Sequence, residues 1–168
     1  ALVALDRQTG VLSRKLSADA PVQGSPVILG DRIHFSDTAG TVFCYSLSSG
    51  ELVWKRATGA PVLSTVTLDE DRIYVSNVDD VVYALDSSSG DLLWRYEHRG
   101  DPSRKGDITL FGSPKPLAHD GRVFVGFSDG SAVALSRENG VAEAAAWIGS
   151  GRYPDVIASI VALDDGLV

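Results

Sequence analysis

One pattern of 13 residues occurs twice in this chain and twice more in a weaker form. Residues 42–54 and 82–94 align one for one, so that Trp54 corresponds to Trp94. Each copy has apolar residues on both sides of a small polar turn that ends in glycine. The four glycines lie 40, 40 and 50 residues apart, and they are Gly10, Gly50, Gly90 and Gly140. A period of about 40 residues with several strands per unit is typical of a propeller blade.

A second motif repeats at the same spacing and completes the unit. A five-residue run that starts with arginine and continues mainly with apolar or aromatic residues begins at residues 32, 72 and 122. An apolar segment precedes each of these runs. Val, Ile, Tyr, Phe and Thr dominate these runs, and Gly, Asp, Asn and Ser separate them, which favours short strands joined by tight turns. The expected strands are residues 22–29, 31–36, 41–47 and 51–57, then 62–68, 71–76, 80–86 and 91–97, then 112–118, 121–127, 131–136 and 141–148.

The sequence therefore predicts an all-β fold, a β-propeller built of four-stranded antiparallel blades. Residues 1–168 are expected to form a single partial arc of three whole blades, at about 22–57, 62–97 and 112–148, with half blades at 1–16 and 156–168. A four-stranded sheet has two apolar faces, so blades stack face to face. Trp54 and Trp94 are the expected anchors between blades, and Trp147 is expected to replace them in the last copy, where the matching position is Ala144.

Composition excludes several classes of protein. The net charge of −7 argues against nucleic-acid binding, which requires clustered Lys and Arg. No run of 18 apolar residues is present, and the single cysteine, Cys44, lies in an apolar alternation that favours the core. The chain starts inside a repeat unit and has no methionine, so we expect it to be part of a longer protein whose targeting segment lies outside this sequence.

No pattern of catalytic or metal-binding residues is apparent. The acidic clusters at 69–71, 79–80 and 164–165 lack the spacing of a calcium loop and are expected to be solvated turn residues. His34, His98 and His119 have no His or Cys within five residues, and His34 occupies the place of a strand residue. We therefore predict no catalytic residues, no metal site and no cofactor.

The informative departure from the repeat is an insertion. Ten extra residues lie between Trp94 and Ser113, in the connection between two blades, and the next such connection, residues 149–155, is also enlarged. Successive turns of a meander alternate between two ends of the sheet, so both insertions are expected on one face, where repeat proteins usually bind partners. The candidate protein-binding residues are Ile108, Leu110, Phe111, Arg152, Tyr153 and Asp155. The alternative is that the aromatic side chains only cover a blade edge.

The segment Ala84-Leu85-Asp86, followed by Gly90 and Trp94, resembles the repeat of the pyrroloquinoline-quinone-like propeller superfamily. Within that superfamily the chain is most similar to the outer-membrane assembly lipoproteins of the BamB family, through residues 108–116, 126–130 and 152–156. This resemblance implies a non-catalytic, periplasmic scaffold with a lipid anchor outside the present sequence. It also implies that Ile108, Leu110 and Asp155 dock onto the POTRA domains of the barrel-assembly protein BamA.

Two other functions share the repeat. A pyrroloquinoline-quinone-dependent dehydrogenase would carry a quinone and calcium over the channel of its propeller, and the resemblance would then imply a vicinal cysteine pair, of which only Cys44 is present. A sensor domain of a signalling protein would be followed by a membrane span. The absence of a catalytic set together with the enlarged connections favours the scaffold.

Overall fold

The computed structural model describes residues 1–100, 113–148, 156, 159–163 and 166–167. Three four-stranded antiparallel sheets follow one another, each with its strands in chain order. The first blade consists of β3 (Val27–Leu29), β4 (Arg32–Ser36), β5 (Thr41–Ser46) and β6 (Leu52–Ala57). The second consists of β7 (Thr67–Asp69), β8 (Arg72–Ser76), β9 (Val81–Asp86) and β10 (Leu92–Glu97). The third consists of β11 (Leu117–His119), β12 (Arg122–Gly126), β13 (Ser131–Ser136) and β14 (Ala142–Trp147).

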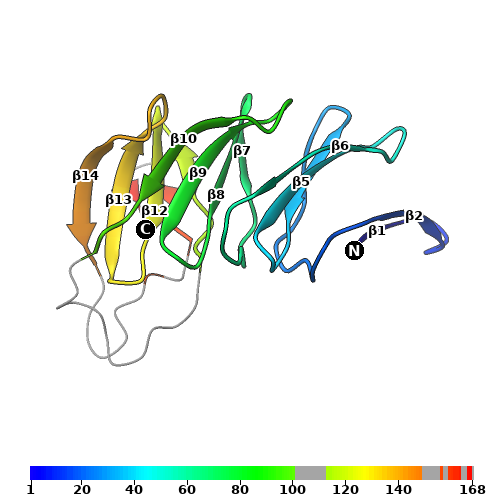
Figure 1. The fold of residues 1–168 in the computed structure, drawn as a ribbon, viewed down its shortest axis with the longest axis horizontal. Coiled ribbons are helices and arrows are strands. Elements are labelled where there is room, and N and C mark those ends of the chain that lie inside the picture. Colours follow the sequence, from blue (N-terminus) through cyan, green and yellow to red (C-terminus); the bar gives the residue numbers. More distant parts are fainter. Residues whose placement is uncertain (101–112, 149–155, 157–158, 164–165, 168) are drawn as a thin grey trace.

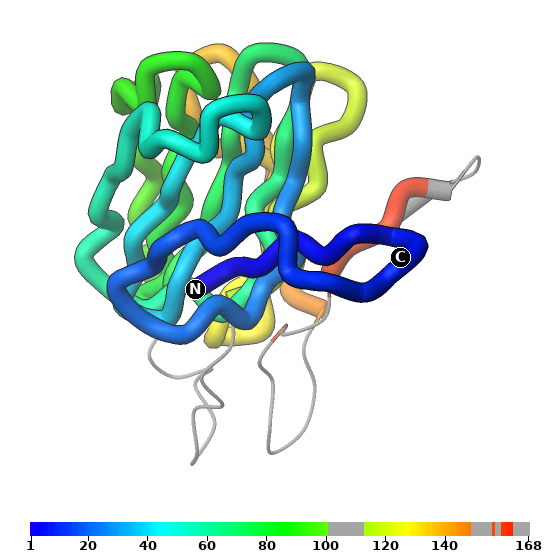
Figure 2. The backbone as a smooth tube through the Cα atoms, turned by 90° about the vertical axis from the view of Figure 1, so that its right-hand side faces the viewer, coloured from blue at the N-terminus to red at the C-terminus, as the bar shows by residue number. Residues whose placement is uncertain are grey.

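A two-stranded hairpin lies at each end of this series. The leading hairpin pairs β1 (Leu2–Leu5) with β2 (Leu12–Leu16), and the trailing hairpin pairs β15 (Ala162–Leu163) with β16 (Gly166–Leu167). The blades stand side by side, with the leading hairpin at one end of the row and the trailing hairpin beside the third blade (Figure 1). Seen from the leading hairpin, the blades lie one behind another (Figure 2). The predicted all-β partial arc is confirmed.

The hydrophobic core is divided into layers between the blades. One layer joins the leading hairpin to the first blade through Leu16 and Phe35, and a second joins the first blade to the second through Trp54 and Ile73. The third layer joins the second and third blades, and it includes Tyr74. Neighbouring residues of β8 thus face opposite blades, as the two-residue period of a strand requires. Face-to-face stacking thus gives the first and second blades a core layer on each side, whereas β14 at the outer side of the third blade stays exposed.

The first strand of each blade is shorter than predicted. The strand expected at 62–68 pairs only over Thr67–Asp69, and the one expected at 22–29 pairs only over Val27–Leu29. Val62 and Val66 are fully buried, which accounts for their apolar character, but they lie in the core without a strand partner. The backbone beside them bonds to a turn instead, where Val78 N donates to Pro61 O at 3.0 Å.

Candidate protein-binding face

The six residues predicted to contact a partner lie outside the described residues. They are Ile108, Leu110, Phe111, Arg152, Tyr153 and Asp155. Their positions in space therefore stay a prediction. The residues that lead into and out of the two enlarged connections are described, and they define the framework on which any such site is built.

We use "connector" for the segment between two blades and "connector face" for the end of the blades that carries residues 37–40, 77–80 and 127–130. These residues form the turns between the second and third strands of each blade. One backbone hydrogen bond recurs there, from the first connector residue to the last turn residue. The three bonds are Thr58 N to Gly40 O at 2.8 Å, His98 N to Asp80 O at 3.0 Å, and Ile148 N to Gly130 O at 2.9 Å. Turns and connectors therefore share one face, as the strand order predicted.

The far end of the first enlarged connector is held by the preceding connector. Ser113 Oγ accepts hydrogen bonds from Leu63 N at 2.9 Å and from Ser64 N at 3.2 Å. The next residue, Pro114, accepts a bond from Ser76 Oγ at 2.6 Å through its carbonyl oxygen. Ser113 is buried, so these bonds satisfy polar groups that water does not reach. Both ends of this connector are thus fixed to the framework.

The three tryptophans predicted as anchors have two kinds of environment. Trp54 and Trp94 are buried and each donates through Nε1 to a carbonyl of the following blade, Ser87 O at 3.1 Å and Arg137 O at 2.9 Å. Trp147 is 50% exposed, and its Nε1 donates to Asp129 O of its own blade at 3.1 Å. Its described hydrogen bond therefore lies within one blade rather than between two.

Acidic turn residues gather around an arginine on the opposite end of the blades, which we call the hairpin face. Arg137 in the third blade donates from Nε to Asp69 Oδ2 at 2.9 Å and from Nη2 to Glu70 Oε2 at 2.6 Å. These two carboxylates belong to the second blade, so their bonds to Arg137 join neighbouring blades. The prediction that they are only solvated turn residues was therefore incomplete. A hollow of about 450 Å³ beside them is lined in part by His119 and Asp120.

Two buried residues of the first blade are unsuited to chemistry. Burial lowers the pKa of His34 despite a 2.9 Å hydrogen bond between Nε2 and Ser87 O. Burial also raises the pKa of the Cys44 thiol to about 11, so it is not a ready thiolate. His34 lies in β4, as predicted, directly opposite Cys44 in β5. Among the residues that the structure describes, no group of three or more His, Cys, Asp or Glu side chains is arranged to hold a metal ion.

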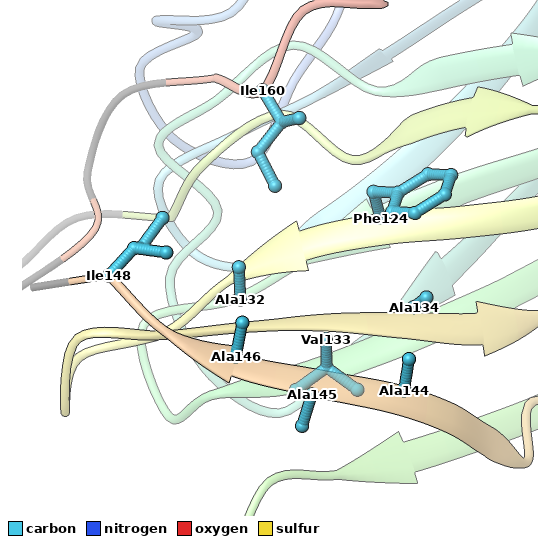
Figure 3. A pocket seen from close by; sticks show the side chains of 9 residues that line it. All are labelled: Phe124, Ala132, Val133, Ala134, Ala144, Ala145, Ala146, Ile148 and Ile160. Atoms are coloured by element: carbon cyan, nitrogen blue, oxygen red, sulfur yellow. The ribbon is translucent and has the colours of Figure 1, made fainter. Parts of the chain in front are cut away.

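An apolar groove of about 480 Å³ runs along the outer surface of the third blade (Figure 3). Alanines of β13 and β14 form most of its floor, and Ile160 extends toward it from the segment before the trailing hairpin. Ala144 stands at the position that Trp54 and Trp94 occupy in the other blades. None of the lining residues titrates, so the groove offers a surface for packing and no acid, base or nucleophile.

One polar pair on the connector face was not singled out by the sequence. His98 Nε2 lies 3.1 Å from Asp129 Oδ1, and the two side chains are only 10% and 2% exposed. The residues are 31 positions apart, so no short sequence motif pairs them. The available signal was a departure from the repeat, because residue 127 is Phe where the first two blades have Asp37 and Asn77.

Known structures share this architecture. BamB from Moraxella catarrhalis matches over 94% of this chain and 49% of its own, with 20% identity and a TM-score of 0.80. The computationally designed Ika8 protein matches over 99% of this chain and 48% of its own, with 13% identity and a TM-score of 0.77. Quinohemoprotein alcohol dehydrogenase from Comamonas testosteroni matches over 76% and 21%, with 21% identity and a TM-score of 0.64. These identities show a common fold, and the chain spans about half of the BamB chain.

The sequence comparisons are more specific. No curated protein matches the chain. The described part of the structure contains no helix of the length and apolar character needed to cross a membrane. The family model described as outer membrane protein assembly factor BamB matches residues 1–167, nearly the entire sequence. On that match, the chain belongs to the BamB family of β-propeller proteins.

Proposed function

We propose that this chain is part of a non-catalytic periplasmic scaffold that takes part in the assembly of outer-membrane β-barrel proteins. Its partner is a protein, bound through the connectors at residues 98–111 and 149–155. Family membership supports the assembly role, since the matching family is described as an assembly factor. The partner we propose is the POTRA region of a BamA-like protein, and the anchor is a lipid attached outside the present sequence.

The observation that carries the proposal is the location of the two enlarged connectors. His98 and Ile148, which begin them, bond to Asp80 O and Gly130 O on the connector face. Both insertions therefore leave the framework from the same end of adjacent blades. Insertions on one face of a repeat protein commonly form its binding surface. A surface of this kind needs the apolar side chains that the sequence supplies there, among them Leu110.

Calorimetric titration of the chain with the soluble POTRA domains of its own organism tests the proposal. We expect binding by the unmodified chain and a loss of roughly tenfold or more in affinity for Leu110→Asp, because a charge would be buried in the contact. Leu93→Asp is the matched control, since Leu93 is 45% exposed on β10 and lies outside the connectors. Equal affinities for Leu110→Asp and the unmodified chain would contradict the proposal.

The dehydrogenase is the second candidate because the fold also matches a quinohemoprotein alcohol dehydrogenase. Incubating the full-length protein with pyrroloquinoline quinone and calcium and measuring dye reduction with alcohols separates the two functions. The scaffold predicts no turnover above that of the free quinone. Turnover that depends on the protein would instead favour the enzyme.

A further inference from the structure

The turn at residues 127–130 of the third blade departs from the repeat at its first position. In the first blade, Asp37 Oδ1 accepts from Thr41 N at 2.9 Å within the turn, and Oδ2 accepts from Ala20 N of the connector at 2.9 Å. In the second blade, Asn77 holds its turn and its connector in the same way. The third blade has Phe127 at this position, and its turn carboxylate lies two residues later, at Asp129.

This rearranged turn holds the start of the first enlarged connector. The ring of His98 stacks on Phe127, with centroids 4.2 Å apart and planes inclined by 15°. His98 Nε2 also approaches Asp129 Oδ1 to 3.1 Å, as a close polar contact rather than a well-aligned hydrogen bond. The backbone at Gly100 packs against the same carboxylate, because a Cβ there would lie 2.4 Å from Asp129 Oδ2. A side chain at residue 100 would displace this carboxylate, so glycine suits the close approach.

The same turn holds both ends of the second enlarged connector. At the start, Trp147 Nε1 donates to Asp129 O at 3.1 Å, and the next residue donates through its backbone to Gly130 O. At the end, Val156 N donates to Phe127 O at 3.1 Å. The side chain of Val156 fills the space beside Gly126, because a Cβ on Gly126 would lie 2.3 Å from Val156 Cγ1. Residues 127–130 thus contact three of the four described connector ends, namely the start of the first enlarged connector and both ends of the second.

The turn is itself fixed, so it can serve as a reference for both connectors. Ser128 donates through N to Asp80 Oδ1 at 3.0 Å, and through its hydroxyl to the other oxygen of that carboxylate, which ties the turn to the second blade. Ser131 N donates to Asp129 Oδ1 at 3.0 Å within the turn. Burial opposes ionisation of Asp129, but the bonds from Ser131 and the contact with His98 outweigh it, and the pKa of Asp129 is lowered.

We propose that the turn at residues 127–130 is a positioning element that fixes the described ends of both enlarged connectors relative to each other, with Asp129 as its central residue. The proposal rests on the proposed function, because the arrangement matters only if both connectors contact one partner. Asp129 itself need not touch that partner, since it is 2% exposed. Its carboxylate acts through His98 and Gly100 on one connector, and its carbonyl acts through Trp147 on the other.

Hydrogen–deuterium exchange of the unbound chain tests positioning without any partner. In Asp129→Ala, we expect faster exchange in peptides from both enlarged connectors. The first connector loses its contact with the carboxylate, and the second is held less firmly because the turn loses the bond from Ser131 N to Asp129 Oδ1 that keeps the backbone carbonyl of this residue in place for Trp147. Asp37→Ala is the matched control, since it removes an equivalent turn carboxylate from the first blade. Its effect should be confined to the connector around Ala20. Faster exchange in only one enlarged connector, or in neither, would overturn the proposal.

His98→Phe provides a second variant in case Asp129→Ala does not fold. Phenylalanine keeps the stacking on Phe127 and removes only the contact with Asp129. We expect faster exchange in the first enlarged connector, with a free energy of unfolding that changes less than in Asp129→Ala. Unchanged exchange in this variant would show that the contact with Asp129 does not position the first enlarged connector, which would contradict the proposal.

Titration with POTRA domains connects positioning to function. Affinity should fall roughly 3- to 30-fold in Asp129→Ala and in His98→Phe but not in Asp37→Ala. Combining Asp129→Ala with Leu110→Asp should cost less than the product of the separate losses, because a misplaced connector has little contact left to lose. Full additivity would indicate a merely structural role and contradict positioning. If the unmodified chain binds no POTRA domain while the exchange results hold, the proposed partner is wrong and positioning stands.

Discussion

The indole ring of Trp54 packs so closely on Gly90 of the next blade that a Cβ on Gly90 would lie 2.6 Å from a ring carbon. The indole nitrogen donates to Ser87 O of the same turn, so one side chain combines apolar packing with a hydrogen bond. Trp94 repeats the relationship with Gly140, again at 2.6 Å. The repeat motif is therefore a device that joins each blade to the one after it, because its tryptophan and glycine meet only between neighbouring copies.

Removing this tryptophan should weaken the stack of blades. We expect Trp54→Ala to lower the free energy of unfolding by about 3–5 kcal/mol, since it empties a buried site between two sheets. Trp147→Ala should cost less, because half of that side chain is already exposed. Urea unfolding followed by circular dichroism measures both. Equal losses in the two variants would show that burial between blades is not what makes Trp54 important.

The glycine of the motif should be more sensitive where a neighbour covers it. Gly10 and Gly90 have nearly the same positive φ, 71° and 73°, and Gly10 has no atom near its Cβ position. Gly10→Ala should therefore cost only the strain of a left-handed residue, about 1–2 kcal/mol. Gly90→Ala should cost that amount and about 1–3 kcal/mol more, because the Trp54 ring must move. Thermal unfolding of both variants checks the difference, and equal melting temperatures would contradict it.

His34 should make the protein less stable in mild acid. Its pKa is lowered by burial, so the folded state favours the neutral ring. The stability from this group is fully present above the unfolded pKa of about 6.5 and is lost as the pH falls below it. The urea midpoint should drop more between pH 7.5 and pH 5.5 in the unmodified chain than in His34→Phe, which carries the residue found at the equivalent Phe124. An identical drop in both would rule out His34 as the cause.

Cys44 should be unreactive in the folded protein. The side chain is fully buried, and burial raises the pKa of its thiol to about 11. At pH 8 a disulfide reagent such as Ellman's should therefore react at least roughly 100-fold more slowly with the native chain than with the chain in guanidinium. Complete reaction of the native chain within minutes would place Cys44 at an accessible site instead of in the core.

The blade architecture was predictable because it depends on local and periodic features. Alternating apolar residues and the spacing of Gly50 and Gly90 set the strands and the turns between them. The limits of the first strands were not predictable, since Val62 has the apolar character of a strand residue but is buried without a strand partner. Burial and strand pairing impose the same residue preference, so sequence alone does not separate them.

Contacts between blades were less accessible to sequence reasoning. Arg137 binds Asp69 across 68 residues, and His98 meets Asp129 across 31. Neither pair shows a motif, because each depends on how two sheets stack. The repeat still helps, since it places Phe127 where a turn carboxylate is expected and so marks the altered turn. Such departures from a repeat are where the structure adds most to the sequence.

The dissociation constant of the chain and its POTRA partner, compared between two charge reversals, tests the account most directly. Asp155→Arg alters the proposed binding surface, and Glu51→Arg makes the same change in charge at an exposed turn on the hairpin face. We predict that Asp155→Arg weakens binding at least roughly tenfold and that Glu51→Arg leaves it unchanged. Equal effects of the two variants, or a loss confined to Glu51→Arg, would contradict binding through the connector face.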